Sequence, residues 1–235
     1  MTMPRALGVA AAALLVFTPL LLDAAGRVVT FPSADGRTLT GLLMEARDRP
    51  APAVVLVPML GRPRDDWQVV AQRFADANIS ALAIDLPAAV LPADPAELTG
   101  WHAAILAAVA YLAGRPGDVR PAAIGVVGAS LGANLAVVAA AADPAIRSIA
   151  LISPSLDYRG LRIEAPLTDY AARPALLMAS VHDPYAARSV RALAQGAPGI
   201  REVRWSNVPA HGTALLARDA ELTRSLVEWF QRTLE

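Results

Sequence analysis

Short apolar runs rich in valine, isoleucine and alanine alternate with segments of helical spacing, and this alternation is the feature that most limits the fold. Continuous apolar runs fit strands buried on both faces, whereas apolar positions three or four residues apart fit helices that cover a sheet. The segments expected to be strands are Ala53–Val57, Ser80–Ile84, Ala122–Val127, Ile146–Ile152, Ala175–Ser180 and the more polar Arg201–Ser206. The segments expected to be helices are Asp65–Ala77, Ala96–Leu112, Leu131–Ala142, Tyr185–Gln195 and Ala214–Leu234. This order predicts an α/β domain with a mainly parallel sheet and helices on both faces.

A hairpin is expected at the start of this domain. Arg27–Ser33 and Arg37–Met44 have strand character, and the turn sequence Ala34–Gly36 between them contains an Asp-Gly pair. The chain has 235 residues, without an internal repeat or a Ser/Gly-rich linker. Residues 27–235 are therefore predicted to form one domain.

Residues 1–26 have the layout of a targeting segment. Arg5 precedes an apolar run, Ala6–Leu22, and the small residues Ala24–Gly26 follow it. This arrangement is typical of a secretory signal peptide. An uncleaved membrane anchor is one alternative, although the run is slightly shorter than the roughly 20 residues of a spanning helix and contains Pro19. A first core helix is the other, although the run has no polar face. We therefore expect an exported protein, periplasmic or secreted, or one attached to a membrane through its N-terminus.

The residue types that the chain lacks exclude several kinds of chemistry. Without cysteine there is no thiol nucleophile, thiolate metal ligand or disulfide, and without lysine there is no Schiff base. Three histidines, His102, His182 and His211, are too few for a histidine-rich metal site. The formal net charge is zero and like charges form no block, so nothing indicates a nucleic-acid partner. Covalent catalysis would use a serine or threonine with a histidine, and no metal or organic cofactor is expected.

A G-x-S-x-G sequence, Gly128–Gly132, places Ser130 between a predicted strand and a predicted helix. In this setting the short motif forms a nucleophile elbow. Its glycines remove side chains that would collide where strand and helix crowd together. The amide of Leu131 lies at the helix N-terminus, where it is unpaired and can donate to an oxyanion. The motif therefore predicts a nucleophilic serine, and a Gly/Ser-rich structural turn is the alternative.

His211 is the predicted general base, because a serine hydroxyl is a poor nucleophile until a base removes its proton. It follows the last predicted strand, on a loop where such a base is expected. His102 lies in a helical segment and His182 beside a carboxylate, so structural or surface roles are expected for both.

Asp183 is the predicted acid that orients the histidine, because it closely follows the strand Ala175–Ser180. Its alternative role is to cap the helix that begins near Tyr185, and the two roles would compete for the same oxygens. Asp157, which follows the preceding strand, is the rival acid. The order Ser130, Asp183, His211 matches a known chain order of serine hydrolases.

With these motifs the chain resembles the α/β-hydrolase superfamily, in particular its small esterase-like and dienelactone-hydrolase-like members. The resemblance covers roughly Phe31 to the C-terminus and rests on Ala53–Trp67, Gly128–Gly132, the Asp183 loop and the loop His211–Thr213. It implies the α/β-hydrolase fold for residues 27–235. It also implies that the amide of Leu60 is the second donor of the oxyanion hole.

The chain departs from these relatives in two places. Dienelactone hydrolases proper use a cysteine where this chain has Ser130, which favours simple ester hydrolysis. Pro58-Met59 replaces the usual His-Gly, and since glycine lets the backbone approach the substrate, Met59 leaves the geometry of that half of the oxyanion hole open.

Only about twenty residues separate Ile152 from Arg173, where larger relatives insert a cap domain. We therefore expect no cap domain and an open cleft.

The expected function is that of a serine hydrolase that cleaves carboxylic esters of small soluble substrates through an acyl-enzyme. A peptidase or an acyltransferase on the same three residues is an alternative, because fold and triad do not set the leaving group. A hydrolase-shaped binding protein with weak turnover is another. The substrate and the oligomeric state are not determined by these patterns.

Overall fold

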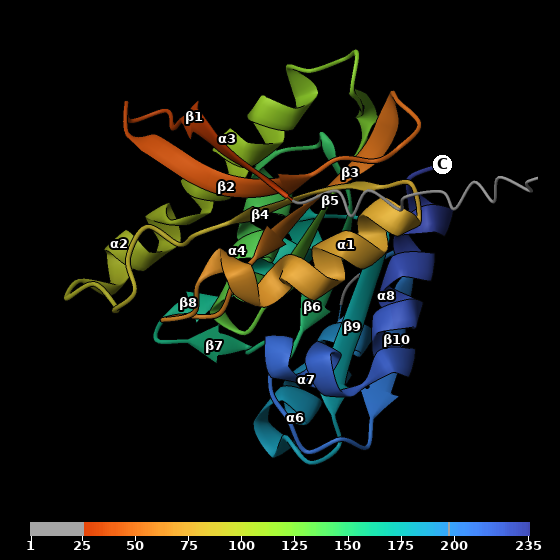
Figure 1. Ribbon diagram of the computed structural model, residues 1–235. Helices are drawn as coiled ribbons and strands as arrows, with labels where there is room; N and C mark the ends of the chain where they lie inside the picture. The colour runs from red at the N-terminus through yellow and green to blue at the C-terminus, as the bar shows by residue number, and fades with distance from the viewer. Residues whose placement is uncertain (1–25, 197) are drawn as a thin grey trace, which may run out of the picture.

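An eight-stranded sheet in the order β1-β2-β4-β3-β5-β6-β9-β10 forms the centre of the computed structural model, which describes residues 26–196 and 198–235 (Figure 1). Its strands are β1 (Arg27–Pro32), β2 (Thr38–Met44), β3 (Ala51–Val57), β4 (Ser80–Ile84), β5 (Val119–Ala129), β6 (Ile146–Ile152), β9 (Ala175–Ser180) and β10 (Arg201–Ser206). Strand β2 is antiparallel to both of its neighbours, and the remaining pairs are parallel. The prediction of a mainly parallel sheet that begins with a hairpin is therefore confirmed.

Helices cover both faces of this sheet. One face packs against α3 (His102–Ala113), α4 (Leu131–Ala142), α5 (Glu164–Asp169) and α6 (Pro184–Gly196). The other packs against α1 (Gln68–Asp76), α7 (Thr213–Arg218) and α8 (Ala220–Thr233); α1 lies in front of the sheet in Figure 1. The side chains of β3 alternate between the two apolar clusters, with Val55 and Val57 in one and Val54 and Leu56 in the other. Burial on both faces explains why the sequences of central strands such as β3 and β4 are continuously apolar.

Two segments that were each predicted as one long helix are broken in the structure. The segment Ala96–Leu112 is divided into α2 (Pro95–Gly100) and α3. The segment Ala214–Leu234 is divided into α7 and α8 at Asp219, whose backbone is extended. The Asp219 carboxylate accepts a hydrogen bond from the Leu222 amide, so this residue starts a new helix instead of continuing the previous one. The helix predicted from Asp65 begins with a 3₁₀ turn, η1 (Arg64–Trp67).

The connection between β6 and β9 is short. It consists of a two-stranded hairpin, β7 (Asp157–Tyr158) and β8 (Leu161–Arg162), followed by α5. Neither the hairpin nor α5 was predicted, because segments of two to six residues are too short to show a hydrophobic period. No cap domain lies between β6 and β9, as expected.

One described segment, Pro95–Ala113, is long and apolar enough to cross a membrane by length and composition alone. It spans α2 and α3, and Ile105, Val109 and Leu112 of α3 are buried in the core of the domain. A core helix accounts for this apolar character. The predicted targeting segment, residues 1–26, lies outside the described residues except for Gly26.

Candidate active site

Ser130 lies between β5 and α4 in a strained backbone conformation. Its φ of 52° and ψ of −118° belong to a region that residues other than glycine rarely adopt. Its amide donates to the carbonyl oxygen of Ile152, on the neighbouring strand β6, over 2.9 Å. A strained residue held between a strand and the helix that follows it has the geometry of a nucleophile elbow.

The two glycines of the motif are required by close backbone contacts. A Cβ atom on Gly128 would lie 2.1 Å from the carbonyl oxygen of Gly132. A Cβ atom on Gly132 would lie 2.5 Å from the carbonyl oxygens of both Val57 and Pro58. The steric role predicted for these glycines is therefore confirmed, and Gly132 also lets α4 approach the loop after β3.

Asp183 and His211 are in contact, and the carboxylate of Asp183 has a second partner as well. Oδ2 of Asp183 lies 2.5 Å from Nδ1 of His211, while its Oδ1 accepts a hydrogen bond of 3.1 Å from the Ala186 amide in α6. Orienting the histidine and capping the helix, which were predicted to compete, therefore use different oxygens. The Asp183 side chain is only 17% exposed, whereas that of His211 is 48% exposed, so the imidazole remains accessible.

Asp157, the rival acid, is occupied within its own hairpin. Its carboxylate accepts hydrogen bonds from Nε of Arg162 at 2.9 Å and from the Gly160 amide at 2.6 Å. These two bonds hold the pKa of the Asp157 carboxyl below its ordinary value. The structure thus brings Asp183, and not Asp157, to His211.

Consecutive residues at the end of β6 hold the elbow and the histidine loop. Ile152 accepts the hydrogen bond from Ser130, and the hydroxyl of Ser153 accepts one of 3.0 Å from the amide of Gly212, the residue after His211. Ser153 is fully buried and, with a φ of 51°, is itself strained. Because both anchors lie side by side, the Ser130 elbow and the His211 loop lie at the same end of β6. The Ser130–His211 hydrogen bond is absent from the described contacts; in free hydrolases this bond often tightens only when substrate binds.

Ser180, the last residue of β9, links the acid loop to the histidine loop. Its hydroxyl donates to the carbonyl oxygen of Val208 at 2.6 Å and accepts a hydrogen bond of 3.0 Å from the His182 amide. The sequence analysis identified neither Ser153 nor Ser180 as part of the site. The signal that could have found them is a serine at or just after the carboxyl end of a predicted buried strand.

Two backbone amides are placed where an oxyanion hole is expected. Leu131 is the first residue of α4, so its amide has no carbonyl one turn earlier in the helix. The amide of Leu60 lies in the loop after β3, and no described residue accepts a hydrogen bond from it. This loop is held by Asp85, which accepts the Arg64 amide at 2.9 Å and pairs with the Arg64 guanidinium. The contact between Gly132 and Pro58 brings the two amides to the same end of the sheet.

Met59, in the loop after β3, packs against the histidine loop. A Cβ atom on Gly212 would lie only 2.0 Å from the Met59 sulfur, and the φ of Gly212 is 57°. The Met59 side chain is thus accommodated because residue 212 has none.

The imidazole rings of the other two histidines take no part in these contacts. The ring of His102 contacts the Thr99 carbonyl oxygen over 2.5 Å, and His182 is an exposed residue next to Asp183. Within residues 26–196 and 198–235, no three His, Asp or Glu side chains are grouped to hold a metal ion.

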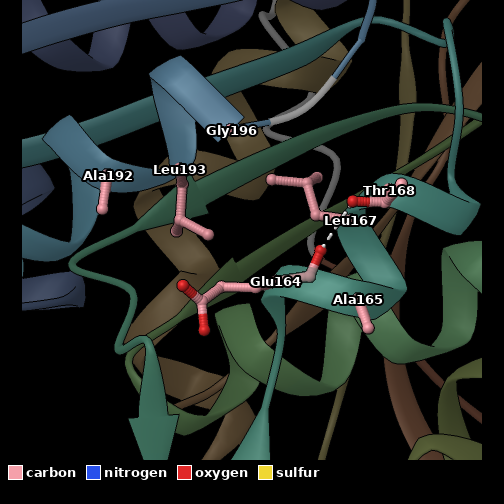
Figure 2. Close-up of a pocket in the computed structure, with 7 residues that line it drawn as sticks. All are labelled: Glu164, Ala165, Leu167, Thr168, Ala192, Leu193 and Gly196. Atoms are coloured by element: carbon pink, nitrogen blue, oxygen red, sulfur yellow. Dashed lines mark hydrogen bonds between the residues drawn. The ribbon is translucent and has the colours of Figure 1, made fainter.

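A separate hollow of about 230 Å³ lies between α5 and α6 (Figure 2). Figure 2 shows the Glu164 carboxylate pointing across it toward Leu193, and the Thr168 hydroxyl donating to the Glu164 carbonyl oxygen over 3.0 Å. The Thr168 hydroxyl is occupied by this backbone contact and no histidine lines the hollow, so we assign it no catalytic role.

No family model and no curated protein sequence matches the chain. Solved structures do match along most of its length. The protein has the α/β-hydrolase fold. A dienelactone hydrolase from Anabaena variabilis has a TM-score of 0.72 at 18% identity, over 89% of this chain and 98% of its own. Est1E from Butyrivibrio proteoclasticus has a TM-score of 0.71 at 16% identity, over 88% of this chain and 98% of its own.

A third structure, DcsB in complex with its substrate analogue, has a TM-score of 0.77 at 12% identity, over 89% of this chain and 99% of its own. At these identities the likeness establishes the α/β-hydrolase fold. The residues of the site must then carry the argument about activity.

Proposed function

We propose that the protein is a serine hydrolase that cleaves carboxylic esters of small, soluble substrates through an acyl-enzyme. The observation that carries the proposal is the contact between Asp183 and His211, on a loop tied to the same end of β6 as the strained Ser130. The fold supports it, since dienelactone hydrolases and esterases are among the proteins of similar structure.

In the proposed reaction, His211 takes the proton from the Ser130 hydroxyl as Oγ attacks the carbonyl carbon of the ester. The Asp183 carboxylate fixes the imidazole tautomer and stabilises the imidazolium that forms. The amides of Leu131 and Leu60 donate to the oxyanion of the tetrahedral intermediate. The intermediate collapses to the acyl-enzyme, and His211 protonates the departing alcohol. A water molecule then attacks the acyl carbon while His211 takes its proton. The second tetrahedral intermediate collapses, His211 gives the proton back to Oγ of Ser130, and the acid is released.

The proposed substrate size follows from the short connection between β6 and β9. This connection contributes only the β7–β8 hairpin and α5, and no cap domain encloses the site. An open site suits small soluble esters, because a large apolar acyl chain would remain in contact with water.

A fluorophosphonate probe tests the proposal, because it labels only an activated serine. We expect the protein to be labelled and to hydrolyse short-chain aryl esters, and Ser130→Ala to abolish both. Ser33→Ala, in the turn between β1 and β2, is a matched control that should retain both. Turnover retained by pure Ser130→Ala protein would overturn the assignment, and an unlabelled wild type would favour a binding protein of the same fold.

We also propose that residues 1–26 direct export or anchor the protein in a membrane. Strand β1 runs parallel to β4, since both are antiparallel to β2, so the chain enters the domain at the amino ends of the parallel strands. The proposed catalytic residues lie at the opposite, carboxyl ends. An anchor would therefore leave the site facing the aqueous compartment, in agreement with soluble substrates.

A further inference from the structure

A shallow pocket of about 430 Å³ lies between the loop after β3 and helix α7. Its walls are formed by Met59, Arg62, Asp66, Thr213, Ala214 and Ala217. Such a volume is within the range of small-molecule sites. Most of this lining is apolar, and its small alanines leave the space open.

This pocket adjoins the proposed reaction centre through two of its walls. Met59 precedes Leu60, whose amide is a proposed oxyanion donor, and its side chain packs against Gly212. Thr213 follows Gly212 and is two residues from His211. A substrate whose carbonyl group occupies the oxyanion hole can therefore extend into the pocket.

The position of the pocket beside the histidine loop indicates which half of an ester it would hold. His211 must protonate the departing alcohol oxygen, so the alcohol portion lies on the histidine side of the carbonyl carbon. Thr213 and Ala214 lie on that side because they directly follow the histidine loop.

The charges at the pocket favour a neutral ligand. Arg62 and Asp66 neutralise each other through two hydrogen bonds, from Nε to Oδ2 at 2.6 Å and from the second guanidinium nitrogen to Oδ1 at 3.0 Å. A charged alcohol group would have to displace one member of this pair.

We infer that this pocket is the leaving-group subsite, and that it binds the neutral, apolar alcohol portion of the ester. The inference rests on the proposed function and adds the chemical class of one half of the substrate.

A substitution that fills the pocket tests the inference. Ala217→Leu puts an apolar side chain into the pocket at an exposed position of α7, where leucine is also a good helix former. Ala110→Leu, at an exposed position of α3 on the other face of the sheet, is the matched control. Two series of esters are compared. In the alcohol series the acyl group is constant and the alcohol is lengthened from methanol to hexanol. In the acyl series the alcohol is always methanol and the acyl group is lengthened. Acid release is followed in a pH-stat.

In the alcohol series we compare kcat/KM for the hexyl ester with kcat/KM for the methyl ester. We expect Ala217→Leu to lower this hexyl-to-methyl ratio by about tenfold or more. The corresponding ratio in the acyl series should stay constant, and Ala110→Leu should change neither ratio. An unchanged alcohol ratio in an active variant, or a selective change in the acyl series, would overturn the inference. If the wild type cleaves no ester of either series, the proposed function itself fails, and that result is distinct from a failure of the subsite alone.

Discussion

The sulfur of Met59 packs against Gly212, the residue that follows His211, so that a Cβ atom at position 212 would lie 2.0 Å from it. This contact joins the loop that carries the proposed oxyanion donor Leu60 to the loop that carries the proposed base. The Met59 side chain fills the space left by Gly212, so a side chain at position 212 is expected to push the two loops apart.

Gly212→Ala should damage both activity and stability. Its φ of 57° strains a residue with a side chain by about 1–3 kcal/mol, and the new methyl group would collide with Met59. Displacement of a catalytic group by about 1 Å can cost about 100-fold in rate, so we expect kcat to fall by about that factor. Ester hydrolysis and thermal unfolding measure the two effects.

Two further variants separate strain from collision. Gly36→Ala has the same kind of positive φ, 82°, but its methyl group would meet no atom within 4 Å, so it should lose stability without losing activity. Met59→Gly combined with Gly212→Ala removes the collision and should recover part of the lost kcat. A Gly212→Ala enzyme with wild-type kcat would contradict the proposed coupling of the loops.

Asp183→Asn should lower turnover by about 10⁴-fold, because the amide cannot hold the imidazole in the required tautomer. The helix cap should survive, since asparagine caps helices as well as aspartate and retains the oxygen that accepts the Ala186 amide. Asp183→Ala should lose the same activity and about 1 kcal/mol of unfolding free energy in addition. Steady-state kinetics and denaturant titrations of both variants distinguish the two roles.

Asp157→Asn is the control for the acid assignment. Its carboxylate is bonded to Arg162 and Gly160 in the β7–β8 hairpin, so we expect turnover to change by less than about tenfold. If Asp157→Asn is the crippling change and Asp183→Asn the mild one, the acid has been assigned to the wrong strand.

The helices and strands that could be predicted from the sequence are those whose bounds are set by their own residues. The bounds of β4, α4, β6 and β9 agree with the expected ranges because continuous apolar runs end abruptly at polar or turn residues. Those of β10 agree as well, although its sequence is largely polar. The β7–β8 hairpin instead depends on a residue far from it in the chain. The Asn134 side chain binds the amide and carbonyl groups of Ser155 at 3.0 and 2.9 Å and the Leu161 carbonyl oxygen at 3.3 Å. No local pattern in the hairpin contains that information.

The candidate site also has a part that could be predicted from the sequence and a part that could not. Ser130, Asp183 and His211 could be predicted because each follows a recognisable strand, and parallel strands bring their carboxyl ends to one edge. The contacts of Gly212 with Ser153 and with Met59 join loops from different strands. Such contacts depend on how the loops pack in three dimensions, which a single sequence does not state.

The N-terminal segment should determine where the protein is found. The N-terminal sequence of protein recovered from the native host should begin near residue 26 if the segment is cleaved, or at Met1 in the membrane fraction if it is an anchor. Leu15→Arg should block either route, because a charge in the middle of the apolar run costs about 2.5–3.5 kcal/mol on insertion. Wild-type protein with an intact Met1 in the soluble cytoplasmic fraction would contradict the proposal.

Ser153→Ala should impair catalysis although Ser153 takes no part in the proposed chemistry. It removes the acceptor of the Gly212 amide, and a buried donor left without a partner costs about 1–3 kcal/mol. If the loop shifts to find another partner, a similar energy is lost from the transition state, so we expect kcat to fall about ten- to hundredfold with little change in KM. Ser148→Ala, on the same strand, removes the partner of the Thr233 hydroxyl at 2.8 Å and is the control for a merely structural loss. Both variants should unfold at lower temperature, but only Ser153→Ala should lose kcat and react more slowly with the fluorophosphonate probe. Equal kcat values for the two variants would mean that Ser153 stabilises the domain without positioning His211.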